Sequence, residues 1–260
     1  MALLSDAAHN FSDVLALIIS YIARKLAGRE SSQTQTYGYR RAEIFSAFLN
    51  SSSLIIISVA LVYGGIERLI KPVSIQGSLV IWLAALSIVL NGLSVLLIKK
   101  EAEESINIRS AYLHLFTDML TSVAVLAGGL AMRYLNWFWL DPVISLGIAF
   151  YLIIGSRKIL LHSLKIMMQF SPENIKPDDI ALSFKKVTGV KNLHHVHLWQ
   201  LNENEVMFEA HVDFEKDISL SEFEEKLQEF EEILAGFGIH HFNIQPEFNR
   251  DDSKEIIHRH

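Results

Sequence analysis

The sequence predicts a two-part protein, an α-helical transmembrane bundle followed by a small α+β domain outside the membrane. Half of the 260 residues are hydrophobic and the mean hydropathy is +0.27, which is high for a soluble chain and low for one that lies wholly within a membrane. The charge balance also changes sign near residue 170. Residues 1–170 hold 14 Lys and Arg against 10 Asp and Glu, whereas residues 171–260 hold 9 against 19.

Long apolar runs fill the first part of the chain, and a helix needs about 20 apolar residues to span a bilayer. Five runs qualify as predicted spans, and they cover about 1–26, 44–70, 76–98, 110–134 and 140–162. The first and fourth runs contain ionisable residues away from their ends. Residues 1–170 are therefore expected to form the transmembrane domain.

The basic residues lie mostly on one side of these spans. The loops 24–43 and 99–109 and the segment after the fifth span hold 11 Lys and Arg, and the opposite side holds 3. The positive-inside rule then puts the basic side, and the domain that follows it, in the cytoplasm. Trp137 and Trp139 fall at the opposite interface, where aromatic belts form.

The second part, residues 171–250, shows the periodicities of a small α+β domain. Val206 to Phe214 alternate apolar and polar side chains, as a half-buried strand does. Ser219 is a candidate N-cap for the helix that follows it. The predicted order is α-β-β-α-β, a ferredoxin-like arrangement, with helices at 176–187 and 219–235 and strands at 193–200, 205–214 and 239–247. Residues 251–260 are expected to form a disordered tail.

Composition also limits the chemistry of the protein. The acidic second part argues against a nucleic-acid partner, which requires a basic surface. The chain has no cysteine, so disulfides and thiolate metal ligands are excluded. A bound metal must therefore use imidazole, carboxylate, amide or water ligands.

Two spans repeat the same pair of ionisable residues. His9 and Asp13 are four residues apart in the first span, and His114 and Asp118 are four apart in the fourth. Residues at this spacing share one face of a helix. A charge at the bilayer centre costs about 2.5–3.5 kcal/mol on insertion scales. Two imidazoles and two carboxylates that converge offset this cost by holding one zinc ion tetrahedrally.

Other polar residues in the spans have plainer interpretations. A single His–Asp pair could be a local hydrogen bond or a polar contact between helices, and the repetition on two spans favours the metal site. Asp6 lies near the start of its helix, where a carboxylate stabilises the helix dipole. Asn50 and Asn91 are interpreted as amides that bridge helices and are not assigned as ligands.

Six segments of the chain resemble the signature segments of the cation diffusion facilitator family. They are "ALLSDAAHNFSD", "YGYRRAEIFSAFLN", "NIRSAYLHLFTDMLTSVAVL", "DPVISLGIAFYLI", "HHVHLWQL" and "HHFNIQPE", and together they extend from Met1 to about Glu247. The resemblance implies a homodimeric transporter in the lipid bilayer, which exports divalent cations, usually zinc, in exchange for protons. It implies no enzymatic activity and no organic cofactor.

The resemblance also implies the positions of the ligands. The transport site of the family falls on His9, Asp13, His114 and Asp118. A site that begins with His resembles those of zinc-preferring members, so Zn²⁺ is the expected substrate, with Cd²⁺ and Co²⁺ as further candidates. The expected location is a bacterial inner membrane with the C-terminal domain in the cytoplasm.

Three features depart from the family pattern. The family has six spans, and the span that precedes "ALLSDA" is missing from this sequence. The loop "QTQTYGYRRAE" contains no His, so no metal site is expected there. The segment "KKEAEESIN" stands where many eukaryotic members carry a His-rich loop.

The second domain has six histidines, and a regulatory metal site is a second hypothesis there. By resemblance, His194 and His211 fall where some relatives place ligands, and Gln245 and Glu247 fall near the others. The candidate ligands are His194, His211, Glu247 and His241, which is added for its place on the strand of Glu247. Strand periodicity puts His211 on the face away from the helices and His241, Gln245 and Glu247 together on one face of their strand. A metal-free sheet face that is rich in His remains the alternative.

The parity of the first strand puts His194 in phase with Val196 and Leu198, on the core side of the sheet. Trp199, on the same strand, is interpreted as a packing residue at a dimer interface.

Three functions remain open from the sequence. The first is a proton-coupled antiporter that works by alternating access. The second is a transport-inactive regulatory fragment that senses metal or pairs with a full-length transporter. The third is an intramembrane metalloenzyme, which is disfavoured because the chain contains no H-E-x-x-H motif and no nucleophile beside the ligands.

Overall fold

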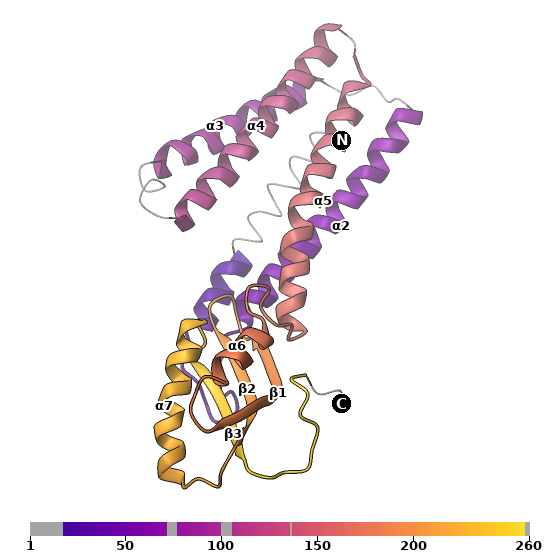
Figure 1. Ribbon diagram of the computed structural model, residues 1–260. Coiled ribbons are helices and arrows are strands. Elements are labelled where there is room, and N and C mark those ends of the chain that lie inside the picture. Colours follow the sequence, from indigo (N-terminus) through magenta and orange to yellow (C-terminus); the bar gives the residue numbers. More distant parts are fainter. Residues whose placement is uncertain (1–17, 72–76, 100–105, 136, 258–260) are drawn as a thin grey trace. The chain divides into compact units, whose positions relative to one another are not determined.

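The computed structural model describes residues 18–71, 77–99, 106–135 and 137–257 (Figure 1). These residues form two compact units. One unit contains Leu49–Leu160, and the other joins Ser20–Phe48 to the part of the chain that begins at Leu161.

Long helices form the first part of the chain, as the apolar runs predict. Their bounds are α2 (Ala42–Ile70), α3 (Gly77–Ile98), α4 (Ile106–Leu135) and α5 (Leu140–Met167). Each begins within about four residues of its predicted span, and α5 continues beyond residue 162. Of the predicted span 1–26, residues 18 onward are described, and residues 18–27 are helical.

The apolar side chains of these helices are largely exposed on the protein surface. By length and composition, α2 and α5 can cross a membrane, and α3 contains a shorter apolar stretch, Ile81–Leu97. Trp82 is 75% exposed and Leu97 is 77% exposed. Apolar surface of this extent is unfavourable in water and favourable against lipid tails.

Small side chains allow the helices of this unit to pack closely. A Cβ atom on Gly128 of α4 would lie 2.5 Å from Ile144 Cδ1 of α5, and one on Gly65 of α2 would lie 3.0 Å from Leu146 Cγ. Close approach at small residues is the usual way in which membrane helices pack. The buried apolar core of this unit comprises Ala84, Val125, Met132, Ile148 and Leu152.

One ion pair joins α2 to α5. Arg68 Nη1 lies 3.5 Å from Asp141 Oδ2, and Asp141 is fully buried in the first turn of α5. A carboxylate without solvent access needs such a partner, because desolvation of an isolated charge is costly.

The second unit contains a three-stranded sheet with the order β1 (Val190–Gln200), β2 (Val206–Phe214) and β3 (His241–Glu247). Strands β1 and β2 are antiparallel, and β2 and β3 are parallel. A parallel pair requires a crossover connection, which α7 (Leu220–Gly236) supplies; α6 (Pro177–Phe184) precedes β1. The predicted α-β-β-α-β order is therefore confirmed.

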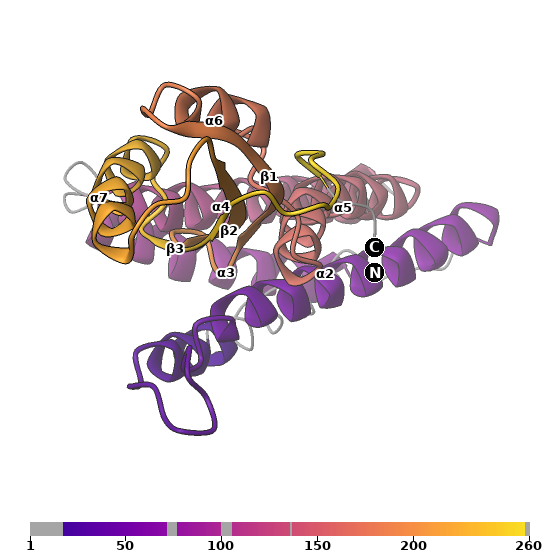
Figure 2. The ribbon, with the colours of Figure 1, turned by 60° about the horizontal axis from the view of Figure 1, so that its bottom comes forward.

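One face of the sheet packs against α6 and α7 (Figure 2). Phe208, Ala210 and Val212 of β2 alternate along the strand and are buried in this core. Phe184 of α6 stacks on Phe230 of α7 with ring centroids 4.5 Å apart. The opposite face carries the polar half of the alternation.

The predicted N-cap of α7 is confirmed. The Ser219 hydroxyl accepts a hydrogen bond from Glu222 N at 3.3 Å, and Ser219 N donates to Glu222 Oε2 at 2.7 Å. This reciprocal capping box satisfies two donors at the helix start. The hydrogen bonds that Ser219 N and the Ser219 hydroxyl donate to the Glu222 carboxylate hold the pKa of Glu222 below its usual value.

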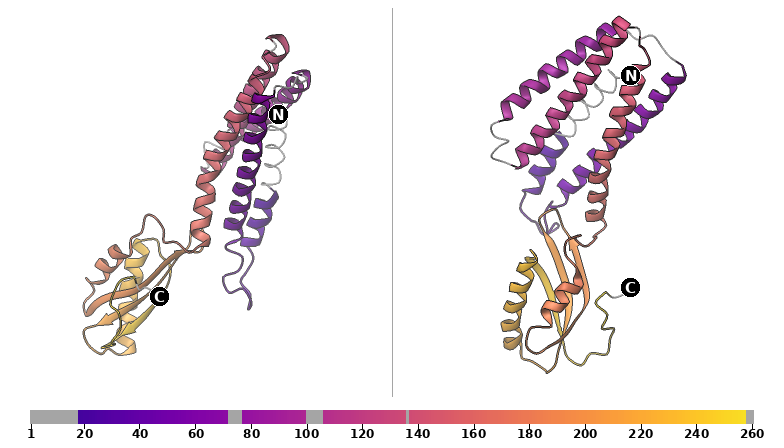
Figure 3. Two further views of the ribbon diagram at one scale, coloured as in Figure 1. Left: turned by 90° about the vertical axis from the view of Figure 1, so that its right-hand side faces the viewer. Right: turned by 45° about the horizontal axis from the view of Figure 1, so that its top comes forward.

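Residues 251–257, which the sequence predicts as a disordered tail, make backbone hydrogen bonds to β1 in the structure. After β3 the chain turns back and runs beside β1 (Figure 3, right). His195 N donates to Glu255 O at 3.1 Å, and Val196 N donates to Ile256 O at 2.8 Å. The physical reason is that β1 is an edge strand whose free backbone groups need partners, and the tail provides carbonyl oxygens.

We predict that Phe230→Ala destabilises the second unit by about 3–5 kcal/mol, because it removes a buried aromatic ring and leaves a cavity beneath Phe184. Pulse proteolysis of the purified chain in urea, with cleavage followed within residues 171–257, measures the change. Leu220→Ala, at a position 83% exposed, is the control and should change stability by less than about 0.5 kcal/mol. Equal effects of the two substitutions would contradict the assigned core.

Candidate metal sites

The structure describes one half of the predicted membrane site. His9 and Asp13 lie outside the described residues, and His114 is described by its backbone in α4. Asp118 lies one turn further along α4 and is buried, with 7% of its surface exposed. Because the two positions are four apart on a continuous helix, they share one face of α4.

Two hydroxyl groups follow Asp118 within one turn of α4. Ser122, one turn after Asp118, forms a buried hydrogen bond of 2.9 Å with Ser87 of α3. Thr121 Oγ1 donates to Asp118 O at 2.8 Å. Asp118 therefore lies one helical turn from a buried hydroxyl pair that joins α3 and α4.

A second cluster lies on the polar face of the C-terminal sheet. His194, His211, Glu247 and Asp252 each present one ligand atom, and these atoms lie within 4.8 Å of one another. His194 Nε2 is 3.2 Å from Glu247 Oε2 and 3.6 Å from Asp252 Oδ2. His211 Nδ1 is 2.9 Å from Glu247 Oε1. Two imidazoles and two carboxylates form a donor set that suits zinc.

Strand register brings these residues together. His194 pairs with His211 across β1 and β2, and Asp213 pairs with Glu247 across β2 and β3. Paired residues on neighbouring strands share a face of the sheet. His211 therefore faces away from the helices, as its position in the alternation predicts.

The predicted orientation of His194 is wrong. Leu193 and Val196 both lie in the helix-covered core, although three residues separate them. The register shifts between His194 and His197, and His195 adopts a left-handed φ of 52°. This bulge adds a residue to β1 and changes the side-chain parity, so His194 lies on the polar face. The imidazole of His195 stacks on that of His211 at 4.5 Å.

Neighbouring groups orient the two imidazoles. His194 Nδ1 lies 2.8 Å from Asn192 Oδ1, and this contact turns the ring so that Nε2 faces the carboxylates of Glu247 and Asp252. His211 Nδ1 makes no hydrogen bond to any described residue, although Glu247 Oε1 is 2.9 Å away. A cation bound to His211 Nδ1 would give this nitrogen a partner, and the neighbouring carboxylates would balance its charge, so the residues present fit a metal ion.

Two basic side chains of the C-terminal segment also reach this cluster. Lys254 Nζ lies 2.9 Å from Asp213 Oδ2 and 3.4 Å from Glu247 Oε2, and it also pairs with Asp252. Arg250 Nη1 lies 3.0 Å from Glu247 Oε1. The structure thus shows a cluster of carboxylates already paired with cationic groups.

These ion pairs shift the pKa values of Lys254 and Asp252. Burial alone lowers the pKa of the Lys254 ammonium, but the hydrogen bonds to Asp252 and Asp213 outweigh it, and the pKa is raised. The hydrogen bond from Lys254 lowers the pKa of Asp252.

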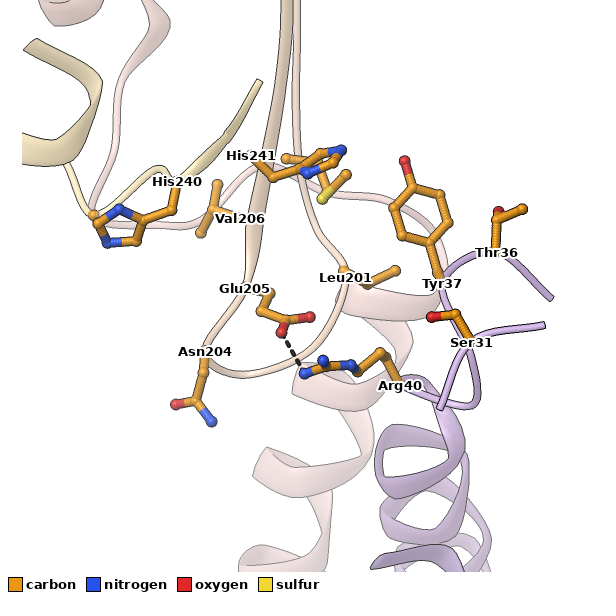
Figure 4. Close-up of a pocket in the computed structure, with 12 residues that line it drawn as sticks. Ser31, Thr36, Tyr37, Arg40, Leu201, Asn204, Glu205, Val206, His240 and His241 are labelled. Atoms are coloured by element: carbon orange, nitrogen blue, oxygen red, sulfur yellow. Dashed lines mark hydrogen bonds and ion pairs between the residues drawn. The ribbon is translucent and has the colours of Figure 1, made fainter. Parts of the chain in front are cut away.

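His241, the remaining predicted ligand, lies outside the cluster. It is at the start of β3, and its ring meets Tyr37 edge to face with centroids 5.8 Å apart. Both side chains line a pocket of about 330 Å³ between the 31–40 loop and the strands (Figure 4). Arg40 Nη1 and Glu205 Oε1, 2.5 Å apart, form an ion pair in the same pocket. Asp252 takes the fourth place in the cluster, and no periodicity in the sequence distinguishes it.

Comparison with known proteins agrees with this architecture. Residues 1–168 match the cation efflux transmembrane domain, and residues 172–248 match the cytoplasmic domain of cation efflux proteins.

Three curated relatives illustrate the similarity. A cadmium, cobalt and zinc/H(+)-K(+) antiporter of Bacillus subtilis is 32% identical over 249 residues, which cover 95% of this chain and 80% of the relative. The metal cation efflux system protein CzcD of Cupriavidus metallidurans is 30% identical over 246 residues, with coverage of 94% and 77%. The zinc transporter ZitB of Escherichia coli is 27% identical over 250 residues, with coverage of 95% and 79%.

Proposed function

Because the chain belongs to the cation efflux family, a family of transporters and not of enzymes, we propose that it exports zinc across a membrane by proton-coupled antiport. The observation that carries this proposal is the match of both parts of the chain to the family, combined with the buried carboxylate of Asp118 within an apolar helix. The names of two relatives support the choice of zinc and of antiport. One is named as a cadmium, cobalt and zinc antiporter and the other as a zinc transporter.

The proposed transport site consists of His9, Asp13, His114 and Asp118. The two carboxylates balance the charge of a divalent ion, and the two imidazoles supply the nitrogen ligands that zinc favours. The spacing of His114 and Asp118 on one face of α4 supports this assignment. A site that begins with His is proposed to prefer zinc over harder cations.

Proton coupling follows from the same ligands. Imidazole and carboxylate bind either a metal ion or protons, so metal binding releases protons and protonation releases metal. If the site opens to one side of the membrane at a time, inward movement of protons drives outward movement of zinc.

The proposed assembly is a homodimer in a bacterial inner membrane. Residues 1–170 form the transport domain and residues 171–250 form the cytoplasmic domain through which two copies pair. The cytoplasmic domain is only about 80 residues long, and small domains bury a limited fraction of their surface alone. This size favours association with a second copy.

A regulatory metal site is proposed at His194, His211, Glu247 and Asp252, with Asp252 in place of His241. The four converging ligand atoms support it. Zinc there would compensate the carboxylates of the acidic domain. It would bias the transporter toward whichever conformation binds it more tightly.

We predict that Asp118→Ala reduces zinc uptake into vesicles to background, since the substitution removes both a ligand and a charge from the transport site. The measurement uses purified chain in vesicles that contain a zinc-sensitive dye. Glu43→Ala, which removes an exposed carboxylate in the first turn of α2, is the control and should transport at the parent rate. Near-parent uptake by Asp118→Ala would exclude Asp118 from the site.

We predict that His211→Ala weakens zinc binding at the cytoplasmic cluster by at least about tenfold, because loss of a direct ligand costs more than loss of a group that only orients a ligand. Zinc binding is measured by competition with a fluorescent chelator on the full chain in detergent. The Asp118→Ala background removes the membrane site. His241→Ala is the matched control, and it should bind zinc as the background does. A stronger effect of His241→Ala than of His211→Ala would show that the ligand set is wrong.

A further inference from the structure

The C-terminal segment brings a positive charge to the centre of the cytoplasmic cluster. Lys254 Nζ lies 2.9 Å from Asp213 Oδ2, 3.4 Å from Glu247 Oε2 and 3.4 Å from His194 Nε2, and it pairs with Asp252. Three of these four neighbours are proposed zinc ligands. The ammonium group therefore contacts three of the four residues that a metal ion would use.

We propose that Lys254 is a built-in competitor of the metal ion. Residues 254–256 then act as a latch that closes the cytoplasmic site when metal is scarce and is displaced when metal is abundant, whereas Asp252 stays as a ligand. This inference rests on the proposed regulatory site.

Electrostatics makes the two occupants mutually exclusive. The cluster contains three carboxylates, from Asp213, Glu247 and Asp252, and two cationic side chains, Lys254 and Arg250. A divalent ion added beside a bound ammonium would bring two cations within a few ångströms, where unscreened repulsion is large. The ammonium must leave its carboxylates before the metal can take them.

Backbone hydrogen bonds hold the latch in place beside β1. Glu255 O accepts from His195 N, and Ile256 O accepts from Val196 N, so the chain around Lys254 is fixed along the edge of β1. Ile256 also packs against the helix-covered core of the domain. The side chain of Lys254 therefore enters the cluster from an ordered backbone, and Nε2 of His194 faces it.

The latch lies outside the part of the chain that matches known cytoplasmic domains. The match covers residues 172–248, whereas the interactions above involve residues 250–256. Arg250 and Asp252 flank the cluster from the same segment. The segment thus supplies one proposed ligand and the cation that competes for it, which links metal binding to the position of the segment.

Zinc binding by Lys254→Met tests the proposal. The variant keeps a long side chain and removes the charge. In the Asp118→Ala background, the full chain in detergent is titrated with zinc against a fluorescent chelator. If the latched state predominates without metal, Lys254→Met should bind zinc at least about tenfold more tightly than the background, because the competent state no longer has to displace the ammonium. Lys216→Met, which removes an exposed charge from the loop after β2, should leave the affinity unchanged.

Hydrogen exchange supplies a second measurement. The amides of His195 and Val196 are hydrogen-bonded to the latch, so saturating zinc should accelerate their exchange in the background chain. In Lys254→Met their exchange should already be fast without zinc. Zinc affinity of Lys254→Met equal to or weaker than that of the background would overturn the proposal, as would exchange that zinc does not accelerate. Zinc binding to neither chain would remove the regulatory site, and the latch with it.

Discussion

Compensation of buried negative charge is the constraint on which both candidate sites depend. Asp118 is buried on α4, a long and mostly apolar helix, and a buried carboxylate is stable when a proton or a cation accompanies it. The cytoplasmic cluster also concentrates negative charge, because the carboxylates of Asp213, Glu247 and Asp252 lie close together beside one face of the sheet. In the structure, Lys254 and Arg250 compensate this charge. At both places, the membrane site around Asp118 and the cytoplasmic cluster, one cation can replace another as the partner of the carboxylates.

The scaffold explains how the charges come together. In the membrane part, glycines at Gly65 and Gly128 let α5 approach α2 and α4 closely, and hydroxyl groups such as that of Ser122 line the packed surface. In the cytoplasmic part, antiparallel and parallel strand pairing align ligands from β1, β2 and β3 on one face. Helices and strands therefore position most of the proposed ligands in both parts. The exception is the cytoplasmic cluster, to which the irregular C-terminal segment adds Asp252 and Lys254.

Local patterns in the sequence predict most of the fold. The alternation of Val206 to Phe214 identifies β2, Ser219 identifies the start of α7, and the apolar runs identify α2 to α5, because each signal arises from residues close together in the chain. The prediction for His194 failed because the bulge at His195 changes the strand parity, and a bulge has no clear signal in one sequence. The role of residues 251–257 was also missed. Their partners lie about 60 residues away on β1, so neither composition nor periodicity indicates the contact.

Simultaneous measurement of zinc and proton movement tests the exchange of cations most directly. Vesicles that contain the purified chain, a zinc-sensitive dye and a pH-sensitive dye report both ions after zinc is added outside. If metal and protons share the ligands of the membrane site, zinc entry is accompanied by proton exit, and an imposed proton gradient in the opposite sense drives zinc out again. Zinc entry with no proton movement at any imposed pH difference would contradict the shared site.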